Sequence, residues 1–200
     1  MKWGEIQIES LKKMFLNNDN LSIENIDNYK NDKKYKTYLF AMPQACNEAI
    51  NYICNQLPMD GKIYELDKDT ESDYYYLTNL IDDYSKVIDV ITSNKNITWN
   101  MVSRNILKID NWTNENDTVS ILYEYKPDVI TEKTKNNYEI ELPMQYVNLI
   151  PLYIAGELYK DDDLSLATMY MNEFMTLIDN YKNNSEFFSN PVITSVFSIE

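Results

Sequence analysis

The fold is decided by residues 119–181, VSILYEYKPDVITEKTKNNYEIELPMQYVNLIPLYIAGELYKDDDLSLATMYMNEFMTLIDNY. Apolar and polar residues alternate at its start and predict a strand at Val119–Lys126. A shorter strand is predicted at Tyr138–Leu142. Pro143 then opens two helices, which Asp161–Asp163 separate. Strands followed by paired helices predict an α+β fold.

Apolar residues at helical spacing predict two more helices before this stretch. The first runs from about Trp3 to Leu16, and the second covers Tyr35–Leu57. The polar segment Asn17–Lys34 between them predicts a loop, with one short turn of helix around Ile23 as an option. Pro43 falls inside the second helix, where it removes a backbone donor. We therefore expect a kink at Pro43 or a new helix that begins there.

The middle of the chain has a hydrophobic period close to two, which is typical of strands. Asn- and Asp-rich turns separate its segments, and Tyr and β-branched residues concentrate in them. Strands are expected at residues 62–66, 74–77, 86–92, 97–102, 106–109, 119–126 and 138–142. Together they predict a small antiparallel β-sheet or sandwich.

The two C-terminal helices carry apolar stripes of their own. Pro151 lies inside the first stripe, so we expect a second kink there. One carboxylate of Asp161–Asp163 is expected to cap the last helix, by accepting a hydrogen bond from a free N–H at its positive end. The buried stripes are expected to comprise Val147, Ile150, Ile154 and Leu158, and then Leu164, Ala167, Met171, Phe174, Met175, Ile178 and Tyr181.

These elements predict three parts in the chain. Residues 1–58 and 143–182 form a helical bundle, residues 59–142 form a β-rich insertion, and residues 183–200 form a C-terminal extension. With 44% hydrophobic residues among 200, the chain has enough apolar side chains for a real core.

The net charge argues against a protein that binds nucleic acid through its phosphate groups. The formal net charge is −14 and Arg104 is the only arginine, so the surface repels phosphate and lacks clustered bidentate donors. No stretch approaches the roughly 20 apolar residues that a membrane span needs. The first residues carry charges where a signal peptide needs an apolar run, so we expect synthesis in the cytosol.

The composition also argues against most catalytic mechanisms. The chain has no histidine and only 3 glycines, which excludes histidine-dependent triads and phosphate-cradling glycine loops. Cys46 and Cys54 would lie about 12 Å apart on one helix, too far for a disulfide, and are expected to be buried thiols. We expect no catalytic residue, no cofactor and no metal site.

Two local patterns leave alternatives open. The acids of Asp67–Asp73 alternate as in a calcium-binding loop, but Ser72 and Thr78 stand where that loop needs glycine and glutamate. A solvated turn explains them with fewer assumptions. Tyr74–Tyr76 could stack on bases, but consecutive strand residues face opposite sides and no basic residue flanks them in sequence.

Four segments carry a resemblance to a known family. They are MKWGEIQIESLKKMF at residues 1–15, KTYLFAMPQACNEAINYI at 36–53, VSILYEYKPDVI at 119–130 and IELPMQYVNLIPLYIAGELYKDDDLSLATMYMNEFMTLI at 140–178. In their order and their hydrophobic and proline pattern they resemble bacteriophage head-tail connector proteins. These include the portal-adaptor and ring proteins of crAss-like and related podovirus types.

The resemblance implies a structural protein of the virion and not an enzyme. Many copies, commonly a dodecamer, would form a ring in the neck that joins the portal protein to the tail or to a second ring. The subunits would be made in the host cytoplasm. The ring would continue the channel for genome ejection, and an acidic lumen would let DNA pass without specific binding and without a membrane or cofactor.

The C-terminal extension is more apolar than a freely exposed end should be. We expect it to contact the portal or a neighbouring subunit by strand addition or by filling a groove. The alternative is that it folds back on its own core. The candidate contact residues are Phe187, Phe188, Pro191, Val192, Ile193, Val196, Phe197 and Ile199.

Two other classes of function remain open. The first is an acidic DNA-mimic inhibitor of a host nuclease, which the net charge suits. Such a mimic needs a regular array of carboxylates, whereas the acids here are mixed with lysines along most of the chain. The second is an enzyme that uses carboxylates and a divalent ion, against which the missing histidine argues.

Overall fold

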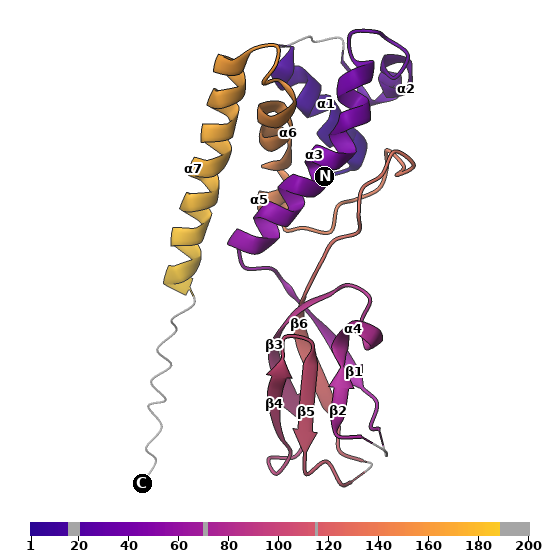
Figure 1. Ribbon diagram of the computed structural model, residues 1–200, viewed down its shortest axis with the longest axis vertical. Helices are drawn as coiled ribbons and strands as arrows, with labels where there is room; N and C mark the ends of the chain where they lie inside the picture. The colour runs from indigo at the N-terminus through magenta and orange to yellow at the C-terminus, as the bar shows by residue number, and fades with distance from the viewer. Residues whose placement is uncertain (16–20, 70–71, 115, 189–200) are drawn as a thin grey trace, which may run out of the picture. The chain divides into compact units, whose positions relative to one another are not determined.

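The computed structural model describes residues 1–15, 21–69, 72–114 and 116–188 (Figure 1). The chain forms two compact units, one from Met1–Pro58 with Val129–Glu200 and one from Met59–Asp128. The first unit is helical and the second consists mainly of antiparallel strands. The fold is therefore α+β, as the sequence predicted.

The helical unit is organised around a short central helix. Its elements are α1 (Trp3–Met14), the 3₁₀ turn η1 (Ile23–Asn25), α2 (Ile26–Tyr29), α3 (Lys36–Gln56), α5 (Met144–Val147), α6 (Ile150–Leu158) and α7 (Leu164–Phe188). Helix α6 packs against α1, α3 and α7, and its first turns are almost entirely buried. A Cβ on Gly156 of α6 would lie 3.1 Å from the Met171 nitrogen, so glycine allows the close approach of α7.

The prolines differ in their effect on the helices. Helix α3 runs through Pro43 without a new start, because buried residues on both sides, including Leu39 and Cys46, hold the helix against the core. The kink expected at Pro151 is instead a complete break of the helix just before it. The chain leaves the helix between α5 and α6, and Pro151 lies in the first turn of α6, where no N–H is needed.

The predicted cap of the last helix is confirmed. Asp163 precedes α7, and its Oδ1 accepts a hydrogen bond of 3.0 Å from the Leu166 nitrogen. The predicted stripe is wrong at Leu164 and Met175, which are exposed, whereas the unpredicted Tyr170 is buried. The buried face of α7 is narrower than the predicted stripe, and its residues recur every three or four positions. It comprises Ala167, Tyr170, Phe174 and Ile178.

Part of the predicted N-terminal loop is helical. Elements η1 and α2 occupy residues 23–29, and Leu21 and Ile26 are buried. The two cysteines form no disulfide, and Cys46 is buried while Cys54 is half-buried. Burial raises the pKa of the Cys46 thiol to about 12.

The second unit contains two three-stranded antiparallel sheets, with orders β1-β6-β3 and β2-β5-β4. Its elements are β1 (Gly61–Leu66), β2 (Tyr74–Tyr76), the helical turn α4 (Leu77–Leu80), β3 (Tyr84–Thr92), β4 (Thr98–Ser103), β5 (Ile106–Asp110) and β6 (Val119–Tyr125). Alternate residues of β5 and β6 are buried, including Leu107 and Ile121. Each sheet thus has one core face and one outer face, which is the pattern of a sandwich.

The predicted strand Tyr138–Leu142 is wrong, and the β unit ends at Asp128 instead of Leu142. The backbone here bonds to the start of α1, with Trp3 and Gly4 nitrogens 2.8 Å from the Tyr138 and Asn136 oxygens. A helix N-terminus has free N–H groups, and they take the acceptors that a strand partner would need. A single bridge between Lys2 and Glu139 remains.

Candidate partner-binding surfaces

The sequence-predicted contact residues lie at the end of the described chain or beyond it. Helix α7 continues to Phe188, so residues 183–188 belong to this helix and not to a separate extension. Phe187 and Phe188 are its last two residues. The other candidates lie outside the described residues, and they are Pro191, Val192, Ile193, Val196, Phe197 and Ile199.

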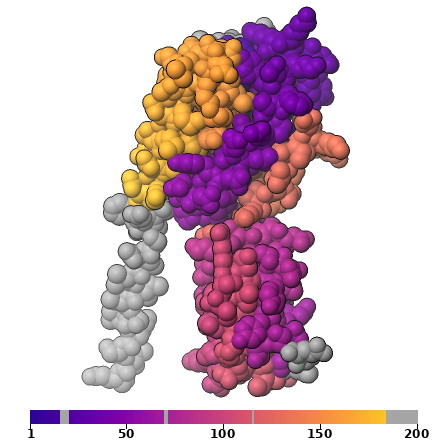
Figure 2. All heavy atoms as spheres, viewed as in Figure 1, coloured from indigo at the N-terminus to yellow at the C-terminus, as the bar shows by residue number. Residues whose placement is uncertain are grey.

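The helical unit carries a groove that the sequence did not indicate. It lies between α1, α3 and residues 130–136, which we call the strap, and Figure 2 shows the strap against the surface of α3. A hollow of about 210 Å³ forms one part, and a more open hollow adjoins it past Phe40 and Pro43. We call the whole the Phe40 groove. The first hollow is lined by Trp3, Gln7, Lys30, Lys36, Leu39, Phe40, Pro43, Thr131, Glu132, Thr134 and Asn136.

The strap is fixed to the helices at both of its ends. Asn47 of α3 acts as a backbone mimic, because its amide donates to the Ile130 oxygen and accepts from the Ile130 nitrogen, both at 2.8 Å. At the other end the Gly4 nitrogen donates to the Asn136 oxygen. A Cβ at Gly4 would lie 3.1 Å from that oxygen, so glycine permits this approach. The strap therefore forms a fixed wall of the groove.

Gln7 lines the groove from α1 and is almost completely buried, with 3% of its surface exposed. Its Oε1 atom accepts no hydrogen bond from any residue within the described parts of the chain. Such an unpaired buried acceptor is costly and uncommon in proteins. Helical spacing places Gln7 on the same face of α1 as Trp3, Leu11 and Met14, and this spacing could have predicted its burial. A pattern of apolar residues alone misses Gln7, because glutamine is polar.

The rim of the groove combines an exposed aromatic ring with lysines. Phe40 is 68% exposed, an unusual degree for a large apolar side chain beside a hollow. Lys36 is exposed and forms no ion pair with another described residue, while Lys30 binds Asp27 at 2.7 Å. The hydrogen bond and charge of Lys30 lower the pKa of Asp27. The rim therefore offers an apolar contact beside the positive charge of Lys36, and the exposed carboxylate of Glu132 lies on the strap side.

The outer face of sheet β1-β6-β3 is aliphatic. Opposed residues on neighbouring strands point to the same side, and Ile63 opposes Leu122 while Ile91 opposes Ser120. A register shift in β3 adds Ile88 to this side, where its Cδ1 and Leu122 meet over Gly61. Ile63, Ile88 and Ile91 are between 45% and 64% exposed. We call these residues with Leu122 the aliphatic face.

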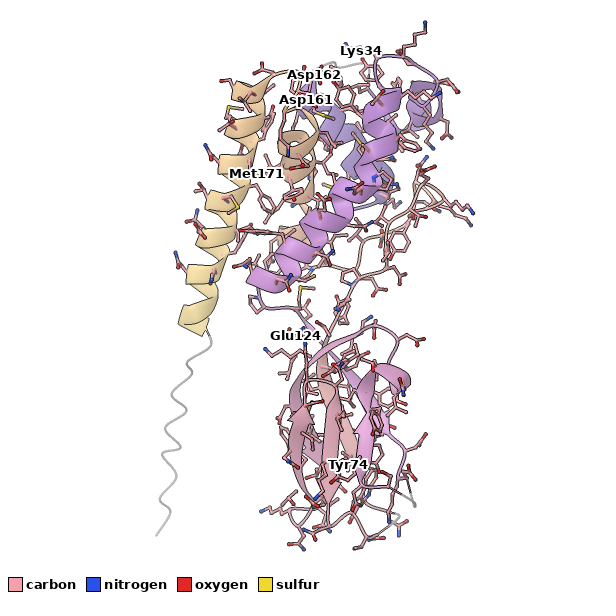
Figure 3. The ribbon with its side chains drawn as sticks, viewed as in Figure 1. Lys34, Tyr74, Glu124, Asp161, Asp162 and Met171 are labelled. Carbon is pink, nitrogen blue, oxygen red and sulfur yellow. The ribbon has the colours of Figure 1, made fainter. Side chains whose placement is uncertain are left out.

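The outer face of sheet β2-β5-β4 is aromatic. Tyr74 (labelled in Figure 3) and Tyr76 are exposed there, whereas Tyr75 points inward and is buried. Burial raises the pKa of the Tyr75 hydroxyl, which accepts a hydrogen bond from the Asp69 nitrogen. Lys108 opposes Tyr74 and lies 5.9 Å from its ring centroid. We call Tyr74, Tyr76, Ile106 and Val102 the aromatic face.

The acidic patterns form no cation site among the described residues, where no group of three or more metal-ligating side chains occurs. Thr70 and Glu71 of the acidic run lie outside the description. In the turn before α7, Asp162 accepts a hydrogen bond of 2.6 Å from the Tyr38 hydroxyl. Burial, and then Asp162, raise the pKa of Tyr38. Figure 3 shows Asp161 and Asp162 at the same end of the helical unit as Lys34.

Comparison with protein-family models and with curated proteins gives no relative for this chain. No protein-family model matches it, and no curated protein matches it at a significant level. Across the described residues, no helix combines the length and the apolar character of a membrane span.

Proposed function

We propose that this chain is a virion structural protein, a subunit of a head-tail connector ring of a bacteriophage. The observation that carries the proposal is the pair of unlike apolar faces on the β unit. A ring grows through heterologous contacts, in which one surface of a subunit binds a different surface of the next. The aliphatic face and the aromatic face supply two such surfaces on one compact body.

The charge supports passage of DNA without adhesion. Residues 59–128 carry 14 acidic and 7 basic side chains, and the remaining residues carry 18 and 11, so each part has a net charge of −7. Neither unit can release many counterions from DNA, which is the main source of nonspecific affinity. A ring of such subunits has an acidic surface that repels the phosphate backbone.

The rival function, a DNA-mimic nuclease inhibitor, is less well supported. Lysines interrupt the acidic surface in pairs such as Lys62 with Asp83 at 2.8 Å and Lys108 with Asp110 at 2.6 Å. A mimic needs carboxylates that are spaced regularly and are free of such partners. A competition assay with DNA for a host nuclease tests it, and inhibition at stoichiometric protein would favour the rival.

The connector role is tested by co-expression with the portal protein of the same genome. We expect negative-stain electron microscopy to show an added ring of density on the portal. Ile91→Asp on the aliphatic face should abolish this ring, whereas Leu80→Asp, a similarly exposed change in α4, should leave it intact. A portal that stays bare with the unmodified chain would contradict the proposal.

A further inference from the structure

Helix α7 and the Phe40 groove lie on opposite flanks of α3. Tyr52 of α3 contacts Phe174 of α7, with ring centroids 5.5 Å apart, whereas Asn47 holds the strap. Five residues along a helix turn through about 140°, so these two contacts lie on nearly opposite faces of α3. Figure 1 shows the same order, with α7 on one side of α3 and the strap on the other.

The groove suits an apolar segment with a negative charge near its end. Trp3 and Leu39 give it apolar walls, and Phe40 can cover a bound side chain. A cavity of about 150 Å³ is enough to hold a benzene ring, so the hollow of about 210 Å³ has room for one aromatic side chain. Lys36 provides a cation at the rim that forms no ion pair with another described residue.

Residues 189–200, SNPVITSVFSIE, match this chemistry. Phe197 is the aromatic residue of the segment, and Glu200 follows it after two residues. A segment of this length can span about 40 Å when extended. Because α7 leads into it from the flank opposite the groove, the groove of an adjacent copy is the better-placed target.

We propose that residues 189–200 of one copy bind in the Phe40 groove of the neighbouring copy. Phe197 enters the hollow beside Phe40, and Glu200 meets Lys36. This inference rests on the proposed ring, and it names the contact that links one subunit to the next. The unlike faces of the β unit add a second contact between copies.

The test is disulfide trapping between two full-length variants. Glu132→Cys places a thiol on the exposed strap side of the groove, and Phe197→Cys places one on the segment. When the two variants are mixed under mild oxidation, alone and co-expressed with the portal, we expect a covalent dimer. The matched control replaces Glu132→Cys with Met169→Cys, at an exposed position of α7, and mixes it with Phe197→Cys. This mixture should give about tenfold less dimer.

Two further measurements separate the outcomes. A chain with both Glu132→Cys and Phe197→Cys should form a covalent ladder, and a closed monomer would instead show that the segment binds its own groove and overturn the inference. Phe40→Asp should reduce trapping about tenfold, and Met144→Asp, an equally exposed change in the helical unit, should not.

Failure of this inference is distinguishable from failure of the connector role. Rings on the portal without trapping above the Met169→Cys control would overturn the groove contact and leave the connector role intact. A bare portal together with trapped oligomers would overturn the connector role and support the groove contact. A bare portal without trapping would overturn both.

Discussion

At the scale of single residues, the helical unit contains a polar side chain that its own packing does not satisfy. Gln7 occupies a position on α1 where neighbouring turns present Trp3, Leu11 and Met14 to the core. Its amide oxygen is closed to water and has no donor among the described residues. A buried acceptor of this kind lowers the stability of the chain.

Replacing this acceptor should stabilise the free chain. We expect Gln7→Met to raise the free energy of unfolding by about 1–2 kcal/mol, because the unpaired oxygen is removed and the volume is kept. Denaturant unfolding of the purified chain measures this. Gln145→Met, at an exposed position, should change the value little. A loss of stability with Gln7→Met would show that the amide has a partner in solution.

The Asp83 carboxylate links strands of the sheet β1-β6-β3. Asp83 binds Lys62 Nζ at 2.8 Å and accepts a hydrogen bond of 2.9 Å from the Tyr123 hydroxyl. Burial acts to raise the pKa of Asp83, but these hydrogen bonds and the charge of Lys62 lower it on balance. A carboxyl group with a lowered folded-state pKa stabilises the fold above its unfolded pKa of about 3.9.

The lowered pKa of Asp83 sets how the stability of the fold depends on pH. The contribution of Asp83 should be complete near neutral pH and should vanish as the pH falls through its folded-state pKa. The stability difference between the unmodified chain and Asp83→Asn should therefore shrink between about pH 6 and pH 3. Chemical denaturation across this range measures it, with Asp82→Asn as the control on the adjacent exposed residue. A constant difference would contradict the pairing.

At the scale of elements, the start of α7 depends on one carboxylate. We expect Asp163→Ala to destabilise the helical unit by about 1 kcal/mol, because the Leu166 N–H loses its acceptor. Asp161→Ala removes the same charge from the same turn without removing this hydrogen bond. Thermal unfolding of both variants compares them, and equal losses would mean that charge rather than capping stabilises the helix.

Elements whose apolar residues keep one helical or strand period were predictable from the sequence. The alternation of Val119–Tyr125 and the helical spacing of Trp3–Met14 are confirmed, because each depends on burial of one face. Tyr138–Leu142 alternates equally well, yet its backbone bonds to the start of α1. Leu164 fits the stripe of α7 but lies at its first turn, where no neighbouring helix covers it.

At the scale of the whole molecule, the β unit should fold without the helical unit. All six of its strands pair within residues 59–128, and the inner faces of both sheets are buried in the unit. We expect the isolated fragment to show a β-type circular dichroism spectrum and cooperative thermal unfolding. Ile63→Asp on the exposed face should preserve the transition, and Ile121→Asp in the core should abolish it. A fragment that is unfolded would contradict the division into units.

The candidate surfaces were largely hidden from sequence analysis. The apolar residues of residues 183–200 were visible as a pattern, but the groove brings together residues from positions 3 to 136 that no local period connects. The position of Phe40 beside a hollow was equally hidden, because the facing wall comes from the strap, which is distant in sequence. The aliphatic face depends on a register shift in β3, which turns Ile88 outward.

The sequence alone determined the α+β class, most helices and strands, the acidic charge and the capping carboxylates, because these follow from local periods and composition. Only the tertiary structure decided where the β unit ends, which side of each sheet is exposed and that Gln7 is buried without a partner for its oxygen among the described residues. These features depend on which distant segments compete for the same backbone hydrogen bonds and the same buried surface. Such competition is settled only when the chain packs.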